Sequence, residues 1–269
     1  ALHDGEDVDG SIECYAQCLR SYLKYFGKDS LYVAETLVGM GKAFATRENH
    51  QKSLQCFDKA LRIYEFKELL VPKDKMGIIH REIGQSVVQQ GGDVHEALEH
   101  YRSSVSFLED CNGNNDLNEQ LLLFYSEMVV FLREALRSDD DVELRAELSE
   151  EIGDVLHRMG NLHATFGAHT KAMDCFAEVL EIQRNTNNDE LRMADLLFNM
   201  GNIHVEMKQF DEALVCLQNS YNITNEALGE GNKELHSTLY LMGVVFMGLA
   251  DLESALEWFT RALSVLTNE

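Results

Sequence analysis

The stretch LLFNMGNIHVEMKQFDEALVCLQNS, residues 196–220, sets a pattern that returns along the whole chain. It has an apolar residue before Gly201 and a His three residues after it. A polar turn follows, and then the small residue Ala213, with Leu217 and Ser220 behind it. Apolar positions three and four residues apart are typical of amphipathic helices. The stretch therefore predicts two helices joined by a tight turn.

The second half of this pattern is a small residue, an aromatic or Leu four residues later, and another small residue three further on. Its six copies start at Ser11, Ser53, Ala97, Ala172, Ala213 and Ala255, and four of the five steps between them are 41 to 44 residues long. The first half precedes five copies, with its glycine at Gly41, Gly84, Gly160, Gly201 and Gly243. A fixed period of this length indicates stacked units, none of which buries its apolar face alone.

The recurring glycine requires a packing reason, because Gly inside a helix costs about 1 kcal/mol relative to Ala. We expect that reason to be a close approach of the two helices of each unit. The single proline, Pro72, lies between two units and suits a helical array.

This layout resembles the tetratricopeptide repeat (TPR), in which Gly and small residues at these offsets let helix A and helix B pack closely. The repeats are longer than the usual length of about 34 residues. They are most similar to the long repeats of kinesin light chains, most clearly at residues 25–37 and 227–235. The resemblance covers nearly the whole chain. It implies an all-α fold, a TPR-type α-solenoid that forms a right-handed superhelix of antiparallel helix pairs.

One step of 75 residues, from Ala97 to Ala172, interrupts the repeat. We predict an N-terminal TPR array with a truncated first repeat, an irregular or degenerate helical segment and a C-terminal TPR array, at residues 1–111, 112–153 and 154–269. The middle segment is predicted to hold one helix at 118–137 and another that starts at Asp141. One alternative is a degraded or remodelled repeat. The other is an inserted helix that occupies the concave groove or binds a partner.

Both ends of the chain break the pattern. Residues 1–10 are predicted to form the turn before a helix B whose helix A is missing, so upstream sequence is expected to be absent. Trp258 and Phe259 lie in a last helix B without a polar capping helix after it. Since solenoids generally need such a cap, we expect more chain or another component to cover that end.

The chain carries 23 Lys and Arg against 46 Asp and Glu, a formal net charge of −23 at pH 7. This balance argues against nucleic acid and anionic membranes as partners, because both require clustered basic residues, and it favours a basic partner. The densest acidic stretch, from Asp139 to Asp154, is either a solvated helix face or a docking patch for a basic peptide. The sequence contains no uninterrupted run of about 18 to 20 apolar residues. We therefore expect no direct insertion into a membrane.

Four of the six cysteines stand directly before the aromatic or Leu of helix B; they are Cys14, Cys56, Cys175 and Cys216. Equivalent positions in adjacent repeats lie on the order of 10 to 20 Å apart, whereas disulfide Cα atoms lie about 4.4 to 6.8 Å apart. We therefore expect reduced cysteines and an intracellular protein, in the cytoplasm first and otherwise inside an organelle.

Catalytic motifs do not occur in the sequence. It has no phosphate-binding Gly loop, no His-Glu-x-x-His, no Gly-x-Ser-x-Gly and no Cys-x-x-Cys. His163 and His204 take a slot that is usually aromatic in TPRs, so we expect them to pack between helices. The prediction is a protein that is not an enzyme, without catalytic residues, metal site or cofactor.

In TPR proteins the concave face is lined mainly by helix A, at set offsets from its Gly. In the C-terminal repeats these offsets select a partner-binding set: His157, Arg158, Asn161, Phe198, Asn199, Asn202, Tyr240, Leu241 and Val244. They also select Asp154, Asp195, Ser237 and Met247 there, and Glu35, Val38, Lys42, Thr46, Arg81, Glu82, Gln85 and Gln89 in the N-terminal repeats.

An Asn amide both donates to and accepts from an extended peptide backbone. The aromatic and apolar members of the set suit an apolar anchor. Asn161 and Asn199 also match half of the carboxylate clamp with which some TPR proteins bind acidic chaperone tails. The basic half is missing, because His157, Ser237 and Leu241 stand in its place.

We therefore expect a noncatalytic protein-interaction scaffold or adaptor that binds a partner segment in its concave groove. The expected partner is a protein or peptide segment that is basic, has apolar anchors, or both. The alternative is a structural or assembly subunit held permanently in a larger multiprotein complex.

Overall fold

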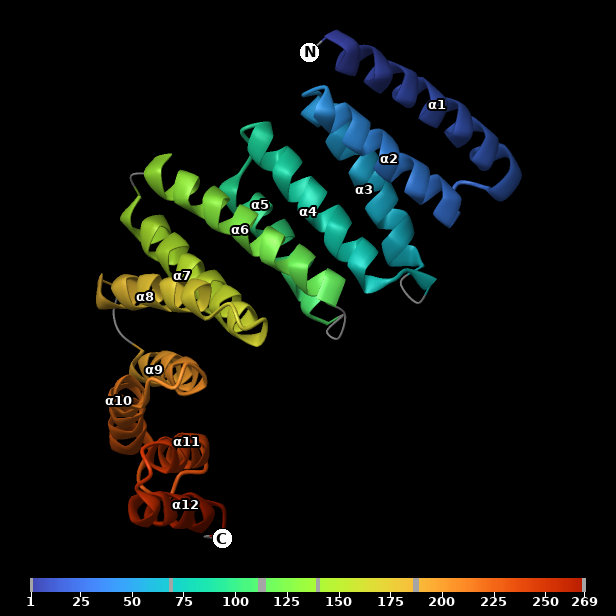
Figure 1. The fold of residues 1–269 in the computed structure, drawn as a ribbon. Helices are drawn as coiled ribbons and strands as arrows, with labels where there is room; N and C mark the ends of the chain where they lie inside the picture. Colours follow the sequence, from blue (N-terminus) through green and yellow to red (C-terminus); the bar gives the residue numbers. More distant parts are fainter. Residues whose placement is uncertain (1, 68–69, 111–114, 139–140, 186–188, 268–269) are drawn as a thin grey trace. The chain divides into compact units, whose positions relative to one another are not determined.

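The computed structural model of the chain describes residues 2–67, 70–110, 115–138, 141–185 and 189–267. Within these ranges it contains twelve α-helices and no strand (Figure 1). The predicted all-α fold of antiparallel helix pairs is confirmed. The helices are α1 (Leu2–Phe26), α2 (Leu31–Thr46), α3 (His50–Phe66), α4 (Lys73–Gln89), α5 (Val94–Glu109), α6 (Asn115–Ser138), α7 (Val142–Thr165), α8 (His169–Asn185), α9 (Glu190–Glu206), α10 (Phe210–Leu228), α11 (Leu235–Gly248) and α12 (Leu252–Thr267).

The helices with the repeat glycine are α2, α4, α7, α9 and α11, and we term them A helices. The B helices, α3, α5, α8, α10 and α12, each pack against the A helix that precedes them. Helix α1 carries the first B-type pattern, and α6 belongs to neither set.

Two compact units make up the chain, residues 1–131 and residues 132–269. The N-terminal unit holds α1 to α5 and most of α6, and the C-terminal unit holds the end of α6 and α7 to α12. The three-part division at 1–111, 112–153 and 154–269 stays a prediction.

The repeat glycine of each A helix faces the aromatic or Leu residue of its B helix. The pairs are Gly41 with Phe57, Gly84 with Tyr101, Gly160 with Phe176, Gly201 with Leu217 and Gly243 with Phe259. A Cβ atom on Gly160 would lie 2.5 Å from Cε1 of Phe176, which is too close for any side chain. At Gly84 the nearest ring atoms would lie 3.4 Å away, so that site is looser. The predicted close approach is confirmed.

The same type of turn ends each of the five A helices. An N–H beyond the helix donates to the carbonyl five residues earlier, as from Asn49 to Phe44 at 2.9 Å. One residue in each turn has a left-handed φ; these residues are Glu48, Gly91, Gly167, Lys208 and Ala250. Since only Gly adopts this conformation without a steric cost, three of the five turns are strained.

Helix α1 differs from the prediction for the N-terminal residues. Residues 2–10, expected to form a turn, belong to a helix that continues unbroken to Phe26. The prediction was wrong because Gly5 and Gly10 each cost only about 1 kcal/mol inside a helix and do not end it. Asp9 also forms an ion pair with Arg47, just after the end of α2.

Both helices predicted for the irregular segment are present, as α6 and the start of α7. Glu127 of α6 accepts hydrogen bonds from Nε and Nη2 of Arg81 on α4, both at 2.6 Å, and from Gln85 at 3.0 Å. Arg81 lies three residues before the repeat glycine of α4. His157 has the same position in α7, and it bonds to Asn199 on the next A helix, α9. Helix α6 thus takes the place of the A helix after α4, which favours the remodelled repeat.

Helices α9 to α12 share a core in the C-terminal unit. Leu217, Leu239 and Met242 are fully buried in it, while Phe198 and Leu241 pack against it and stay partly exposed. The core therefore holds two of the predicted site residues in place.

Candidate functional site

The predicted partner-binding residues lie on three A helices of the C-terminal unit, α7, α9 and α11. We term the surface that they form the A face; α9 contacts both α7 and α11. Arg158, Asn161 and Tyr240 are exposed there. The partly buried members are His157, Phe198, Asn199, Asn202, Leu241 and Val244.

His157 and Asn199 are bonded to each other. The Asn199 amide nitrogen lies 3.0 Å from Nε2 of His157, and a carboxylate oxygen of Asp195 lies 3.3 Å from the same nitrogen. Burial lowers the pKa of His157, although Asp195 and Asp154 act in the opposite direction. Nε2 of the neutral ring accepts from Asn199 in the tautomer protonated at Nδ1 and donates to Asp195 in the other. These side chains are therefore already partly used within the chain.

Asn161 and Asn202 keep their side-chain amides open. Each follows the repeat glycine of its helix, and neither side chain has a hydrogen bond within the described residues. Tyr240 is 51% exposed, with its ring centroid 5.5 Å from Phe259 and 6.5 Å from His236. The A face thus combines two free amides with a supported aromatic ring.

A cleft of about 550 Å³ opens between α7, α8 and the start of α9. Five carboxylates line it, those of Glu143, Glu147, Glu150, Asp154 and Asp189. Arg192 is the one Lys or Arg in this lining, and it binds Glu150 at 3.0 Å as well as Asp154. Burial raises the pKa of Asp154, against the effect of Arg192. Oε1 of Gln183, also in the lining, is buried without a hydrogen-bond partner.

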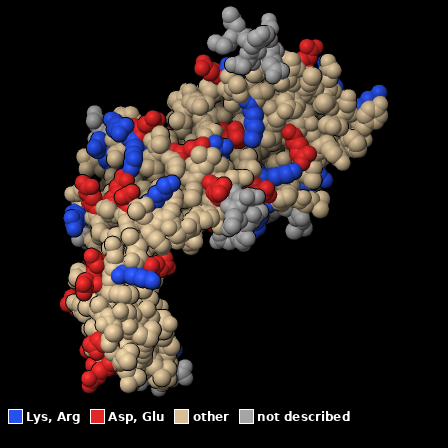
Figure 2. All heavy atoms as spheres, viewed as in Figure 1, with Lys and Arg blue, Asp and Glu red and all other residues tan. Residues whose placement is uncertain are grey.

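A smaller pocket of about 280 Å³ lies between α9, α10 and α11. Asp195 and Phe198 line it from α9, and Ser220 and Thr224 from α10. Glu234, just before α11, completes this part of the wall. Figure 2 shows acidic side chains gathered along one edge of the part formed by α9 to α12. Both hollows are therefore acidic.

Sequence reasoning placed the acidic stretch correctly along the start of α7 but missed its partners. Asp139 and Asp140 lie outside the described residues, whereas Glu147, Glu150 and Asp154 line the cleft. Arg192 lies 42 residues after Glu150, one repeat period. Pairing opposite charges one period apart would have found this contact.

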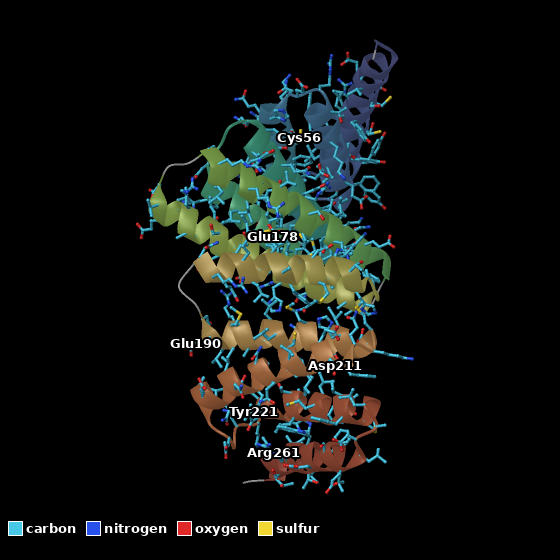
Figure 3. The ribbon with its side chains drawn as sticks, turned by 60° about the vertical axis from the view of Figure 1, so that its left-hand side comes forward. Cys56, Glu178, Glu190, Asp211, Tyr221 and Arg261 are labelled. Atoms are coloured by element: carbon cyan, nitrogen blue, oxygen red, sulfur yellow. The ribbon has the colours of Figure 1, made fainter. Side chains whose placement is uncertain are left out.

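The Trp258 side of α12 is covered within the unit. The guanidinium of Arg261 lies 4.5 Å from the centroid of the Trp258 ring and donates to the Tyr221 hydroxyl at 2.9 Å (Figure 3). Phe246 stacks on Trp258 at 6.4 Å. The exposed apolar side chains of α12 are instead Leu252, Leu256, Leu263 and Leu266.

The cysteines of the B helices are free thiols. Burial raises the pKa of Cys56 and Cys216, and that of Cys175 to about 11, so these groups stay protonated near neutral pH. Cys111 lies outside the described residues. Nowhere in the described part do three or more His, Cys, Asp or Glu side chains form a possible metal site.

None of the helices that the structure describes has the length and apolarity needed to cross a membrane.

Comparison with protein families identifies the repeat. One tetratricopeptide repeat model matches residues 1–65 and 192–268, more than half of the chain, and a second matches residues 153–186. The chain belongs to the tetratricopeptide repeat family. No curated protein matches the sequence.

Solved structures with a similar course of the chain include BtubC from P. vanneervenii, at 16% identity and a TM-score of 0.41, covering 96% of this chain and 91% of that one. Another consists of the nearly identical TPR-like repeats of a kinesin light chain-like protein from Podospora anserina, at 11% identity and a TM-score of 0.39, covering 86% and 94%. The Rap conjugation regulator of plasmid pLS20, in complex with the Phr* peptide, reaches 14% identity and 0.41, covering 87% and 53%. These similarities are weak, and the family assignment rests on the family models.

Proposed function

We propose that the chain is a noncatalytic interaction scaffold that binds an extended segment of a partner protein on the A face. The tetratricopeptide repeat family supports an interaction role in general. The particular surface is supported by Asn161, Asn202 and Tyr240, which remain open on three successive A helices.

The free amides suit the backbone of the segment. Each offers two N–H donors and one acceptor oxygen, so it can bond to both groups of a peptide unit. Tyr240 supplies a rigid aromatic contact, which is a common anchor of binding energy. The partly exposed edges of Phe198 and Leu241 add apolar area beside it.

A basic character of the segment is supported by the charge of the hollows. The cleft between α7, α8 and α9 has five carboxylates and the single guanidinium of Arg192, which is already paired with two of them. With a net charge of −23, the chain as a whole attracts basic partners at low salt.

The test compares partner capture by the wild-type chain and by an Asn161→Ala/Asn202→Ala/Tyr240→Ala variant, in native extract at low and moderate salt. We expect the variant to lose one dominant partner at least tenfold, because each contact contributes about 1 kcal/mol or more. The recovered partner, purified, should bind the wild type more weakly as salt rises.

A matched control carries Thr170→Ala/Asn219→Ala/Thr260→Ala. These residues are exposed polar side chains of the B helices α8, α10 and α12. The control should keep the partner. Equal retention by both variants would reject the A face as the binding surface, and equal loss would show that the effect is not local.

The second candidate function is a permanently assembled structural subunit, and the exposed leucines of α12 favour it. Leu252, Leu256 and Leu263 are 70%, 68% and 61% exposed on one helix. Contiguous apolar surface of this kind is common at obligate interfaces. If this function holds, the free chain self-associates or aggregates, and Leu256→Glu/Leu263→Glu restores a monodisperse monomer in light scattering.

An intracellular, cytoplasmic location is part of the proposal. It is supported by the free thiols of Cys14 and Cys18, which are exposed on α1 and would be open to oxidation outside a reducing compartment. Expression with a fluorescent tag in a eukaryotic cell checks it, and a secreted, disulfide-linked product would contradict it.

A further inference from the structure

We propose that the pocket between α9, α10 and α11 is a subsite for one Lys or Arg side chain of the bound segment. The inference rests on the proposed function, and it specifies which chemical group of the partner is read and where.

The size of the pocket fits a single side chain. Its volume of about 280 Å³ lies just below the range of about 300 to 1,000 Å³ in which pockets hold drug-sized ligands. Phe198 and Asp195 in its wall occupy two of the helix A offsets that define the A face, so a segment lying on that face passes the pocket.

The polar groups of the pocket favour a donor-rich cation. Asp195 on α9 and Glu234 before α11 place negative charge on two different walls. The single proton of the Ser220 hydroxyl is donated to the Ala194 carbonyl at 2.7 Å, so its oxygen presents only lone pairs to the pocket. An ammonium or guanidinium group has only donors and is the natural complement of such a lining.

The apolar part of the wall fits the stem of the same side chain. Leu191 and Phe198 lie on α9 beside the two acidic groups, and Phe198 is itself packed against the core. The methylene stems of Lys and Arg cover apolar surface while the charged head reaches polar groups. A cation near the Phe198 ring gains further from its negative face.

The neighbouring His157 does not neutralise the site. It lies 3.3 Å from Asp195, and burial lowers its pKa, so near neutral pH the ring is uncharged. Within the described residues, neither Asp195 nor Glu234 has a Lys or Arg partner. The two carboxylates therefore remain available to a cation from outside the chain.

The test is a titration with small probes, followed by NMR of the methyl groups. The probes are Nα-acetyl-lysine N-methylamide and its arginine counterpart, and the neutral control is Nα-acetyl-norleucine N-methylamide, which has a stem without the charge. Ala194, Thr224 and Thr238 line the pocket, and their methyl groups report on it. The reference is the methyl group of Ala172 on α8, which is not part of the lining.

We expect saturable shifts of the pocket methyls with at least one cationic probe and not with norleucine. Asp195→Asn/Glu234→Gln should weaken the cationic probe about fivefold or more. The matched control Asp211→Asn/Glu212→Gln makes the same change in net charge on the exposed start of α10 and should leave the affinity within about twofold. Unchanged signals of the methyl groups outside the pocket in the free variants establish that they are folded.

The inference is overturned if neither cation shifts the pocket methyls, if norleucine shifts them equally, or if the two double variants behave alike. The outcome is separable from that of the proposed function. If the cationic probes do not bind but the A-face variant still loses its partner, the subsite alone is rejected. Probe binding without any partner that depends on the A face rejects the function and leaves the subsite.

Discussion

Side chains at equivalent positions of the A helices are used differently in the two units. In the N-terminal unit, Arg81 is bonded to Glu127 on the neighbouring helix and covers the ring of Phe124 at 4.7 Å. In the C-terminal unit, the residue at the same distance before the repeat glycine of α11 is Tyr240, which is 51% exposed. One side chain completes the fold, and the other is open to a partner.

Ion pairs join neighbouring A helices in both units, and in the C-terminal unit Arg192 joins α9 to α7. Lys42 on α2 lies 3.3 Å from Glu82 on α4, and Lys75 on α4 pairs with Glu35 on α2. Between α9 and α11 no ion pair joins the described residues, and a pocket lies there instead. A repeat surface is therefore a candidate binding surface where its polar groups are not already used within the chain.

The largest effect expected from this comparison is at Arg81. Arg81→Met should lower the free energy of unfolding of the N-terminal unit by about 2 to 3 kcal/mol, because Glu127, only 25% exposed, loses its charged partner. Arg192→Met is the matched change in the C-terminal unit and should cost less than about 1 kcal/mol, since Arg192 is 42% exposed. Hydrogen exchange resolved by helix measures each unit separately, and equal losses would remove the contrast.

The second effect concerns packing under the two surfaces. Gly160→Ala should destabilise the C-terminal unit by about 2 kcal/mol, because a Cβ atom would lie 2.5 Å from the buried Phe176 ring. Gly84→Ala should change the N-terminal unit by less than about 1 kcal/mol, because its Cβ would lie 3.4 Å from Tyr101 and Ala favours the helix. Urea denaturation followed by hydrogen exchange resolved by helix measures the change in each unit. A Gly160→Ala variant as stable as the wild type would contradict the packing model.

The third effect is a dependence on pH that is stronger in the N-terminal unit. Nδ1 of His80 lies 3.0 Å from Nδ1 of His100, and burial first and His100 second lower the pKa of His80 to about 4. The unfolded chain binds this proton below about pH 6.5 and the folded chain does not, so stability falls as the pH drops from about 7 towards 4. Because His80 is partly exposed, we expect a loss of about 1 kcal/mol by pH 5.

His80→Gln should remove this loss, while His95→Gln, an exposed change on α5, should keep it. In the C-terminal unit the burial of His157 is opposed by Asp195 and Asp154, so acidification should loosen that unit less. Hydrogen exchange at about pH 5 and pH 7 tests the difference, and a slope shared equally by both units would contradict it.

The smallest effect tests what the two units have in common. Glu48→Gly in the N-terminal unit and Lys208→Gly in the C-terminal unit should each raise the melting temperature, with a gain of about 0.5 to 1 kcal/mol, because both residues have a left-handed φ. Glu48→Ala and Lys208→Ala, which keep the strain, are the controls. A gain in one unit only would show that the turns also differ between the units.

Much of the fold could be predicted from the sequence, because its main contacts are local. The partner of Gly160, Phe176, is 16 residues away, and the same interval of 16 or 17 residues returns in the other four A and B helix pairs. The failure at residues 2–10 has the same origin. One pattern element was read as a turn although nothing there stops a helix.

Only part of the candidate site was accessible in this way. The offsets identified the helices and several exposed residues, but not that Asn199 is bonded to His157, 42 residues before it. The pocket between α9, α10 and α11 was also missed, because it leaves no local pattern. The exposed leucines of α12 have the spacing of one helix face, but their exposure depends on what packs against that helix. These features depend on how neighbouring repeats stack.

The sequence by itself determined the helix pairs, the glycine contacts within them, the family and the acidic character of the chain. Only the tertiary structure decided which side chains of the A helices are used within the fold and which remain open. The physical reason is distance along the chain. Periodicity constrains contacts within one repeat, whereas the pairing of Arg81 with Glu127 and the openness of Tyr240 depend on the neighbouring helices that stacking places beside them.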